Sequence, residues 1–238
     1  MTSTEQHVDQ VRRLRAEGRS PKEIARLLGL RPAAVAPIVR TLAREEAAAA
    51  PEPAVTGCWV SRGWNTRLTV SGHEDWPTGP SNNPGAEGLA CVVVARRHKP
   101  QRLTVCGYLV DVFCLGVKNT IGPRIMNDRE LPGFLEMFFN SIHLGQPPLD
   151  APLDLAQHLV LGAVDHARAL GFEPHADFRA TAAQLGAWQE TSAITFGRDG
   201  VPNYISGPDD NPNAIMRTLR KTVGDGNFHF TTGISPDW

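Results

Sequence analysis

One carboxylate stands in the most apolar part of the sequence. Asp111 lies within the run TVCGYLVDVFCLG, whose composition is typical of a central β-strand. Burial of an unpaired carboxylate costs several kcal/mol, so we expect Asp111 to pair with a cation, to bind a metal or to lie at the mouth of a cleft. Lys118 and Arg96 are the candidate cations. A functional and a purely structural role are both open for Asp111.

Four further residues could join Asp111 in acid–base or metal chemistry. They are His175 and Asp177 in GFEPHADF, and Asp209 and Asp210 in GPDDNP. With Asp111 they form the candidate catalytic set of a metal-dependent nuclease or hydrolase, in which a carboxylate cluster holds two metal ions. Their spacing matches no metal motif, however, and Asp209 and Asp210 precede a predicted helix whose dipole favours carboxylates. We therefore predict no metal or cofactor and favour a protein that is not an enzyme, with the hydrolase as the alternative.

The predicted helix at residues 152–170 is apolar nearly all round, apart from one narrow polar stripe. A polar stripe on a packed helix is ordinarily its solvent-exposed face, and we expect that here, with metal binding as the alternative. The stripe consists of Asp154, Gln157, His158, Asp165 and Arg168.

The N-terminal fifth of the chain is rich in cations. Residues 1–48 contain nine Lys and Arg residues against six acidic ones, whereas the whole chain has a formal net charge of −1. A basic segment joined to a mildly acidic remainder is typical of proteins that bind polyanions, although a solvated helix surface has the same composition. The candidate nucleic-acid-binding residues are Arg12, Arg13, Arg15, Arg19, Lys22, Arg26, Arg31 and Arg40.

Three short helices are predicted to carry these cations. The spacing in EIARLLGL resembles the helix-turn-helix of bacterial regulators, resolvases and sigma-type factors. Ser20 and Glu23 form a capping box at the start of the second helix, and Gly29 supplies the turn after it. The apolar face predicted for this helix is Ile24, Leu27 and Leu28.

The third helix, in LGLRPAAVAPIVRTL, occupies the place of a helix that reads bases. Its first turns offer Ala and Pro instead of side chains that bond to base edges. Pro37 removes a backbone hydrogen bond and is expected to bend or shorten the helix. We therefore predict a module that holds the phosphates of DNA or of structured RNA, including ribosomal RNA, and does not read sequence. Such a regulator would work with the ribosome or RNA polymerase; docking on another protein is the alternative function of the module.

Two segments of the remaining chain, WVSRGWNTR and VARRHKPQR, bring Arg close to aromatic or other basic residues. Aromatic side chains interleaved with Arg can stack on nucleic-acid bases. Packing combined with ordinary surface charge produces the same pattern, and we favour that interpretation.

The expected fold class is α+β. A three-helix helix-turn-helix module at residues 1–46 is followed by an Ala/Pro linker at 47–56 and by a mostly antiparallel α+β domain at 57–238. Within that domain, AITFGRDGVPNYIS predicts a hairpin with its turn at Asp199 and Gly200. NPNAIMRTLRKTVG predicts an amphipathic helix capped by Asn211.

Cysteine spacing and hydropathy indicate the cellular compartment. The four cysteines include no C-x-x-C pair, so we expect buried, reduced thiols. No apolar run is long enough to span a bilayer, and no signal peptide is visible. The expectation is a cytoplasmic protein without a membrane partner.

Several longer segments resemble a known group of proteins. GCWVSRGW, CGYLVDVFCLGVKN, GFEPHADF and ITFGRDGVPNY are similar to a group of actinobacterial helix-turn-helix-containing proteins with a shared C-terminal region. The similarity covers most of residues 57–233. It implies an actinobacterial, cytoplasmic origin and the two-part layout, and it assigns no catalytic residue.

Overall fold

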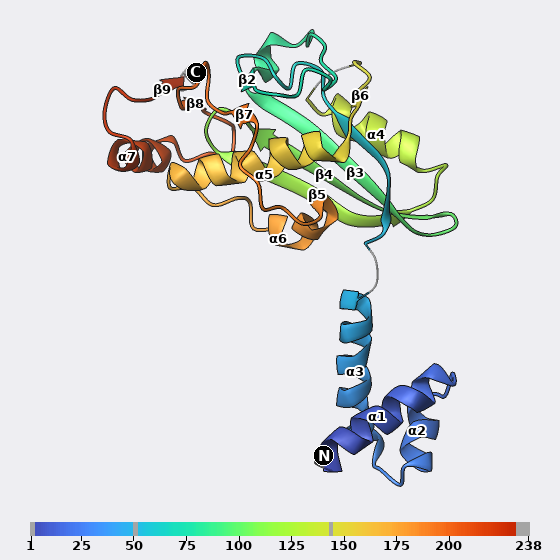
Figure 1. The fold of residues 1–238 in the computed structure, drawn as a ribbon. Helices are drawn as coiled ribbons and strands as arrows, with labels where there is room; N and C mark the ends of the chain where they lie inside the picture. The colour runs from blue at the N-terminus through green and yellow to red at the C-terminus, as the bar shows by residue number, and fades with distance from the viewer. Residues whose placement is uncertain (1–2, 50–51, 143–144, 232–238) are drawn as a thin grey trace, which may run out of the picture. The chain divides into compact units, whose positions relative to one another are not determined.

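The chain divides into two compact units, Met1–Glu52 and Pro53–Trp238. The computed structural model describes residues 3–49, 52–142 and 145–231 (Figure 1). The fold is α+β, as predicted, with helices at the N-terminus and a mostly antiparallel five-stranded sheet in the second unit. No helix among the described residues is long and apolar enough to cross a membrane.

Three helices make up the first unit: α1 (Ser3–Ala16), α2 (Pro21–Leu27) and α3 (Pro32–Ala49). The predicted capping box is present, because Ser20 accepts a bond from the Glu23 amide while the Glu23 carboxylate accepts one from the Ser20 amide. After α2 the chain turns at Gly29, whose φ is +64°. The Leu30 amide then donates to Ala25 O at 2.9 Å, which closes the helix end. The buried core of this unit is Val11, Ile24, Ala25, Val35 and Leu42.

One expectation for this unit is wrong, and a second is wrong as to the length of α3. Leu27 is not part of the apolar core, since 55% of its surface is exposed. Pro37 does not shorten α3, which continues for 18 residues. Proline has no N–H, so Pro37 cannot donate to the Ala33 carbonyl. Both residues are exposed, and water can therefore satisfy that carbonyl. As a result α3 occupies residues 47–49 of the segment expected to be a linker, and the first strand of the second unit begins at Ala54.

The sheet of the second unit has the strand order β5-β4-β3-β1-β6. Its long members β3 and β4 form a hairpin, and β5 pairs with β4. The run expected to be one continuous strand around Asp111 is interrupted there, because β4 ends at Asp111 and β5 starts after a turn. The strands are β1 (Ala54–Val60), β3 (Leu89–Lys99), β4 (Arg102–Asp111), β5 (Gly116–Met126) and β6 (Leu149–Asp150).

Helices cover both faces of this sheet (Figure 1). Alternate side chains of β3 separate the two faces: Val92 and Val94 pack with α5, and Val93 packs with α4. The helices are α4 (Leu131–Asn140), α5 (Leu153–Ala169) and α6 (Phe178–Thr181), the last followed by the 3-10 turn η2 (Ala182–Leu185).

The C-terminal segment forms a third, smaller core around α7 (Pro212–Thr222), which is capped by Asn211 as predicted. The turn at Asp199 and Gly200 is also present, with φ of 53° and 82°. The expected hairpin is reduced to one antiparallel bridge between Arg198 and Val201 across this turn. Its longer arms pair elsewhere: β7 (Ile194–Thr195) with β2 (Thr69–Val70), and β8 (Asn203–Ile205), in parallel, with β9 (His229–Thr231). The short 3-10 helix η1 (Pro84–Ala86) lies in the long loop before β3.

Candidate functional site

Three of the eight predicted nucleic-acid-binding cations are engaged within the three-helix unit. Arg12 Nη1 lies 3.2 Å from the Asp9 carboxylate, and Arg13 Nε lies 3.4 Å from that of Glu17. Arg15 donates to Val39 O at 2.8 Å and so ties α1 to α3. These three side chains therefore stabilise the unit, and their availability to a ligand is reduced.

The other five cations are exposed on α2, α3 and the turns beside them. Within the part of the unit whose side chains are described, Lys22, Arg31 and Arg40 have no hydrogen bond or ion pair. Arg19 and Arg26 act on Glu23, whose pKa is lowered first by its hydrogen bonds with Ser20 and then by these two charges. The exposed set is Arg19, Lys22, Arg26, Arg31 and Arg40.

The exposed face of α3 is apolar in its first turns. Ala33, Ala34 and Pro37 are exposed there, and Leu27 of α2 adds a large uncovered aliphatic side chain. None of these side chains carries a hydrogen-bonding group. The surface can contact a sugar-phosphate backbone or a protein, but it has no means of distinguishing base edges.

Asp111 is buried, and its partner is the backbone of its own turn. One carboxylate oxygen accepts hydrogen bonds from the amides of Phe113 at 2.9 Å and Cys114 at 3.0 Å. Burial nevertheless raises the pKa of Asp111 to about 6, against the lowering effect of these amides and of Lys118. The expected pairing with Arg96 is wrong, because Arg96 donates to the carbonyls of Gln184 and Pro53. Asp111 is a turn-capping residue.

Lys118 pairs with Asp210 and not with Asp111. Its ammonium group lies 2.9 and 3.0 Å from the two carboxylate oxygens of Asp210, which also accepts a bond from the Gly207 amide at 2.7 Å. Although burial alone would raise it, these bonds lower the pKa of Asp210. Asp209 is exposed and makes no hydrogen bond or ion pair in the described part of the chain.

His175 and Asp177 are neighbours on the surface. The Asp177 amide donates to His175 Nδ1 at 3.3 Å, and both side chains are exposed. In residues 3–49, 52–142 and 145–231, no group of three or more His, Cys, Asp or Glu side chains is arranged to hold a metal ion. Asp111, Asp210 and the His175–Asp177 pair therefore have separate partners, and Asp209 stands apart from them, so the described residues do not bring the five catalytic candidates together in one cluster.

Two residues in the polar stripe of α5 are not exposed as expected: Gln157 is half-buried and donates to the carbonyls of Leu185 and Ala187, and His158 is buried. His158 makes ring contacts with His73, Trp76 and Trp188, at centroid distances of 5.2, 5.1 and 4.8 Å. Its Nδ1 accepts a hydrogen bond from the Ala193 amide at 2.9 Å, so its proton lies on Nε2. Burial, and then the nearby His73, lower the pKa of His158. Only the tertiary fold reveals this cluster, because its members come from three distant segments.

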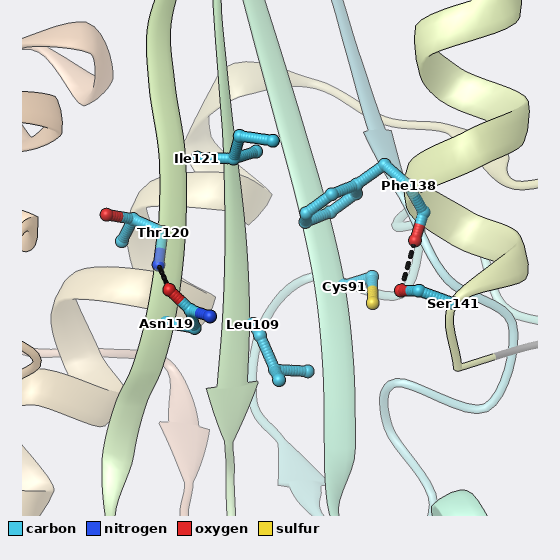
Figure 2. Close-up of a pocket in the computed structure, with 7 residues that line it drawn as sticks. All are labelled: Cys91, Leu109, Asn119, Thr120, Ile121, Phe138 and Ser141. Atoms are coloured by element: carbon cyan, nitrogen blue, oxygen red, sulfur yellow. Dashed lines mark hydrogen bonds between the residues drawn. The ribbon is translucent and has the colours of Figure 1, made fainter.

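A small cavity lies between the sheet and α4 (Figure 2). Its volume of about 160 Å³ is well below the roughly 300 Å³ at which pockets for drug-sized ligands begin. Two of its polar side chains have partners, because Ser141 donates to Phe138 O at 2.6 Å and Asn119 accepts from the Thr120 amide at 2.8 Å. The buried Thr120 hydroxyl has no hydrogen-bond partner among the described residues. The cavity is lined by Cys91, Leu109, Asn119, Thr120, Ile121, Phe138 and Ser141.

All four cysteines are buried and none forms a disulfide, as the sequence predicts. Burial raises the pKa of Cys58 and of Cys91 to about 12, and that of Cys106 to about 11. Thiols in this state are poor nucleophiles at neutral pH, so these cysteines serve the packing of the sheet.

No protein-family model, no curated protein and no solved structure matches this chain.

Proposed function

We propose that the three-helix unit binds nucleic acid by holding its phosphate backbone. The observation that supports this most directly is the set of five exposed cations, Arg19, Lys22, Arg26, Arg31 and Arg40, on and around α2 and α3. Lys and Arg on such a surface release condensed counterions when they neutralise phosphates, which gives binding without sequence specificity. The proposal includes both DNA and structured RNA as targets, and a cytoplasmic location where either is available.

The helical arrangement supports the same proposal. The capping box of α2, the tight turn at Gly29 and the longer α3 have the order of a helix-turn-helix. The apolar first turns of α3 argue against operator-type readout, because discrimination between base pairs requires donors and acceptors at the groove edge.

A triple substitution tests the proposal in the full chain. Lys22→Gln, Arg26→Gln and Arg31→Gln together are expected to weaken binding to duplex DNA and to an RNA stem-loop at least tenfold, by similar factors for every sequence tried. The matched control is Arg179→Gln, Arg217→Gln and Lys221→Gln, which removes the same charge from exposed positions on α6 and α7. Equal affinities of the two variants, or strong preference for one sequence, would contradict the proposal.

Docking on a protein is a second candidate function, favoured by the exposed apolar side chains of Leu27 on α2 and of Ala33 and Pro37 on α3. Under this alternative, Leu27→Ser combined with Ala33→Gln, which changes no charge, would abolish capture of a partner from cell extract. The triple charge variant would leave that capture intact. Under the nucleic-acid proposal, the triple charge variant loses affinity for DNA and RNA. The variant at Leu27 and Ala33 keeps that affinity.

A further inference from the structure

The turn of the β3–β4 hairpin concentrates positive charge at one end of the sheet. Only Pro100 and Gln101 separate Lys99 from Arg102, and these two cations are directly opposite each other in the strand register. Like charges in opposed positions destabilise a hairpin, so this arrangement has a cost unless an anion lies against it. His98, at an irregularity of the same ladder, is also exposed.

The neighbouring segment at residues 124–130 adds to this charge. Residues 97–102 and 124–130 together contain five Lys and Arg residues against two acidic ones, although the chain as a whole has a net charge of −1. Strand pairing places the two segments side by side, because Leu103 of β4 pairs with Met126 of β5. The five cations are Arg97, Lys99, Arg102, Arg124 and Arg129.

Both acidic residues of this region are engaged with other groups. Asp128 forms a two-bond ion pair with Arg97, one bond of which is 3.1 Å long, and this pair lowers the pKa of Asp128. The Glu130 carboxylate accepts a hydrogen bond from the Asn127 amide at 2.8 Å. Lys99, Arg102 and Arg129 are exposed. None of the three has a carboxylate partner among the described residues.

Arg129 lines a polar hollow, and Lys99 and Arg102 flank a second lining residue, Gln101, in the chain. The hollow has a volume of about 380 Å³ and is lined by Gln101, Asn127, Asp128 and Arg129, which come from the hairpin turn and from the turn after β5. The Arg97–Asp128 ion pair joins the two turns and so stabilises the shape of the hollow. Such a hollow can admit a phosphodiester group, whose oxygens would accept hydrogen bonds from guanidinium and amide donors.

We propose that this surface, formed by Lys99, Arg102 and Arg129, is a second contact for the nucleic-acid backbone. The inference rests on the proposed function of the three-helix unit, and it assigns to the second unit a part in holding the same class of ligand. The surface contributes affinity without reading bases, because its donors are suited to phosphates. It also gives a function to the segment VARRHKPQR, whose charge pattern we interpreted from the sequence as packing combined with ordinary surface charge.

Salt titration of binding in the full chain tests this proposal. The probes are a DNA duplex of about 30 base pairs and an RNA stem-loop of similar length, between about 50 and 200 mM KCl. The variant carries Lys99→Gln, Arg102→Gln and Arg129→Gln, and the control carries Arg179→Gln, Arg217→Gln and Lys221→Gln. The hairpin variant should lose two to three units from the slope of log affinity against log salt, about one per phosphate contact, and the control should lose fewer than one. Unchanged thermal unfolding of each variant shows that the fold is preserved.

The outcomes separate this inference from the proposed function. If the hairpin variant behaves as the control while Lys22→Gln, Arg26→Gln and Arg31→Gln weaken binding, the second contact is overturned and the first stands. If only the hairpin variant weakens binding, the second contact stands and the function proposed for the three-helix unit fails. Absence of binding to either probe overturns both. Equal competition by poly-glutamate would indicate an acidic protein partner and would also overturn the inference.

Discussion

The ammonium group of Lys118 lies 2.9 and 3.0 Å from the two carboxylate oxygens of Asp210, ninety-two residues further along the chain. Lys118 belongs to β5, and Asp210 precedes α7, so this pair ties the C-terminal segment to the sheet. The side chains are 20% and 11% exposed, which makes the pair one of the more buried ones among the described residues.

Removal of one partner should therefore be costly. Asp210→Ala leaves a mostly buried ammonium group without its counter-ion, and we expect the free energy of unfolding to fall by about 2–4 kcal/mol. Asp209→Ala is the matched control, because Asp209 is exposed, and it should change stability by no more than about 0.5 kcal/mol. Urea unfolding measures both, and equal effects would show that the ion pair does not hold the segment.

Asp111 should make stability depend on pH in an unusual direction for a carboxylate. Burial raises its pKa from 3.8 to about 6, so the folded state favours the protonated form. Its contribution is fully present below pH 3.8 and is lost as the pH rises through about 6. Asp111→Asn keeps an oxygen acceptor for the Phe113 and Cys114 amides without the charge. At pH 7 this variant should be more stable than the wild type by roughly 1–3 kcal/mol.

The difference between the two stability curves isolates this titration. Plotted from pH 4 to pH 8, it should grow through about pH 6 and then level off. A variant less stable than the wild type at pH 7 would show that the charge of Asp111 is required by the fold.

His158 should have the opposite pH dependence. Its pKa is lowered from 6.5, mainly by burial, so its contribution is present above pH 6.5 and is lost as the pH falls through the lowered value. Protonation places a hydrogen on Nδ1, where it would meet the donating Ala193 amide. Three charged or titratable groups also face the ring. His73 adds to the lowering of the His158 pKa by burial, whereas the carboxylates of Glu190 and Asp154 oppose it.

His158→Asn provides the test, because its side-chain oxygen can accept the Ala193 bond and does not titrate. The variant loses ring packing against Trp76 and Trp188, and its overall stability should fall. Its loss of stability between pH 6.5 and 5 should nevertheless be smaller than that of the wild type, as measured by unfolding followed through tryptophan fluorescence. Parallel curves would show that His158 does not titrate in this range.

Local signals in the sequence were sufficient for the features that depend on near neighbours. The capping box at Ser20 and the Asn211 cap involve groups three residues apart, and both are present. The partners of Asp111 and the burial of His158 depend on which distant segments meet. Asp111 was expected to find a cation, yet the turn amides two and three residues ahead were better placed. The same limit applies to the strands around Asp199, whose local turn was predicted correctly and whose pairing was not.

The cations of the three-helix unit show why composition overestimates a binding surface. Arg12 and Arg13 have acidic neighbours three and four residues away on the same helix, a spacing that favours ion pairs. That part of the outcome could have been predicted from α1 alone. The bond from Arg15 to Val39 O could not, because it depends on how α1 packs on α3.

The most direct test of the central claim is the salt dependence of nucleic-acid binding by the unmodified chain. If the exposed cations hold phosphates, log affinity for a DNA duplex should fall linearly with log salt, with a slope of about −3 or steeper. The affinity should differ little between unrelated duplexes. A flat salt dependence, or no binding to any DNA or RNA at about 50 mM salt, would contradict the account.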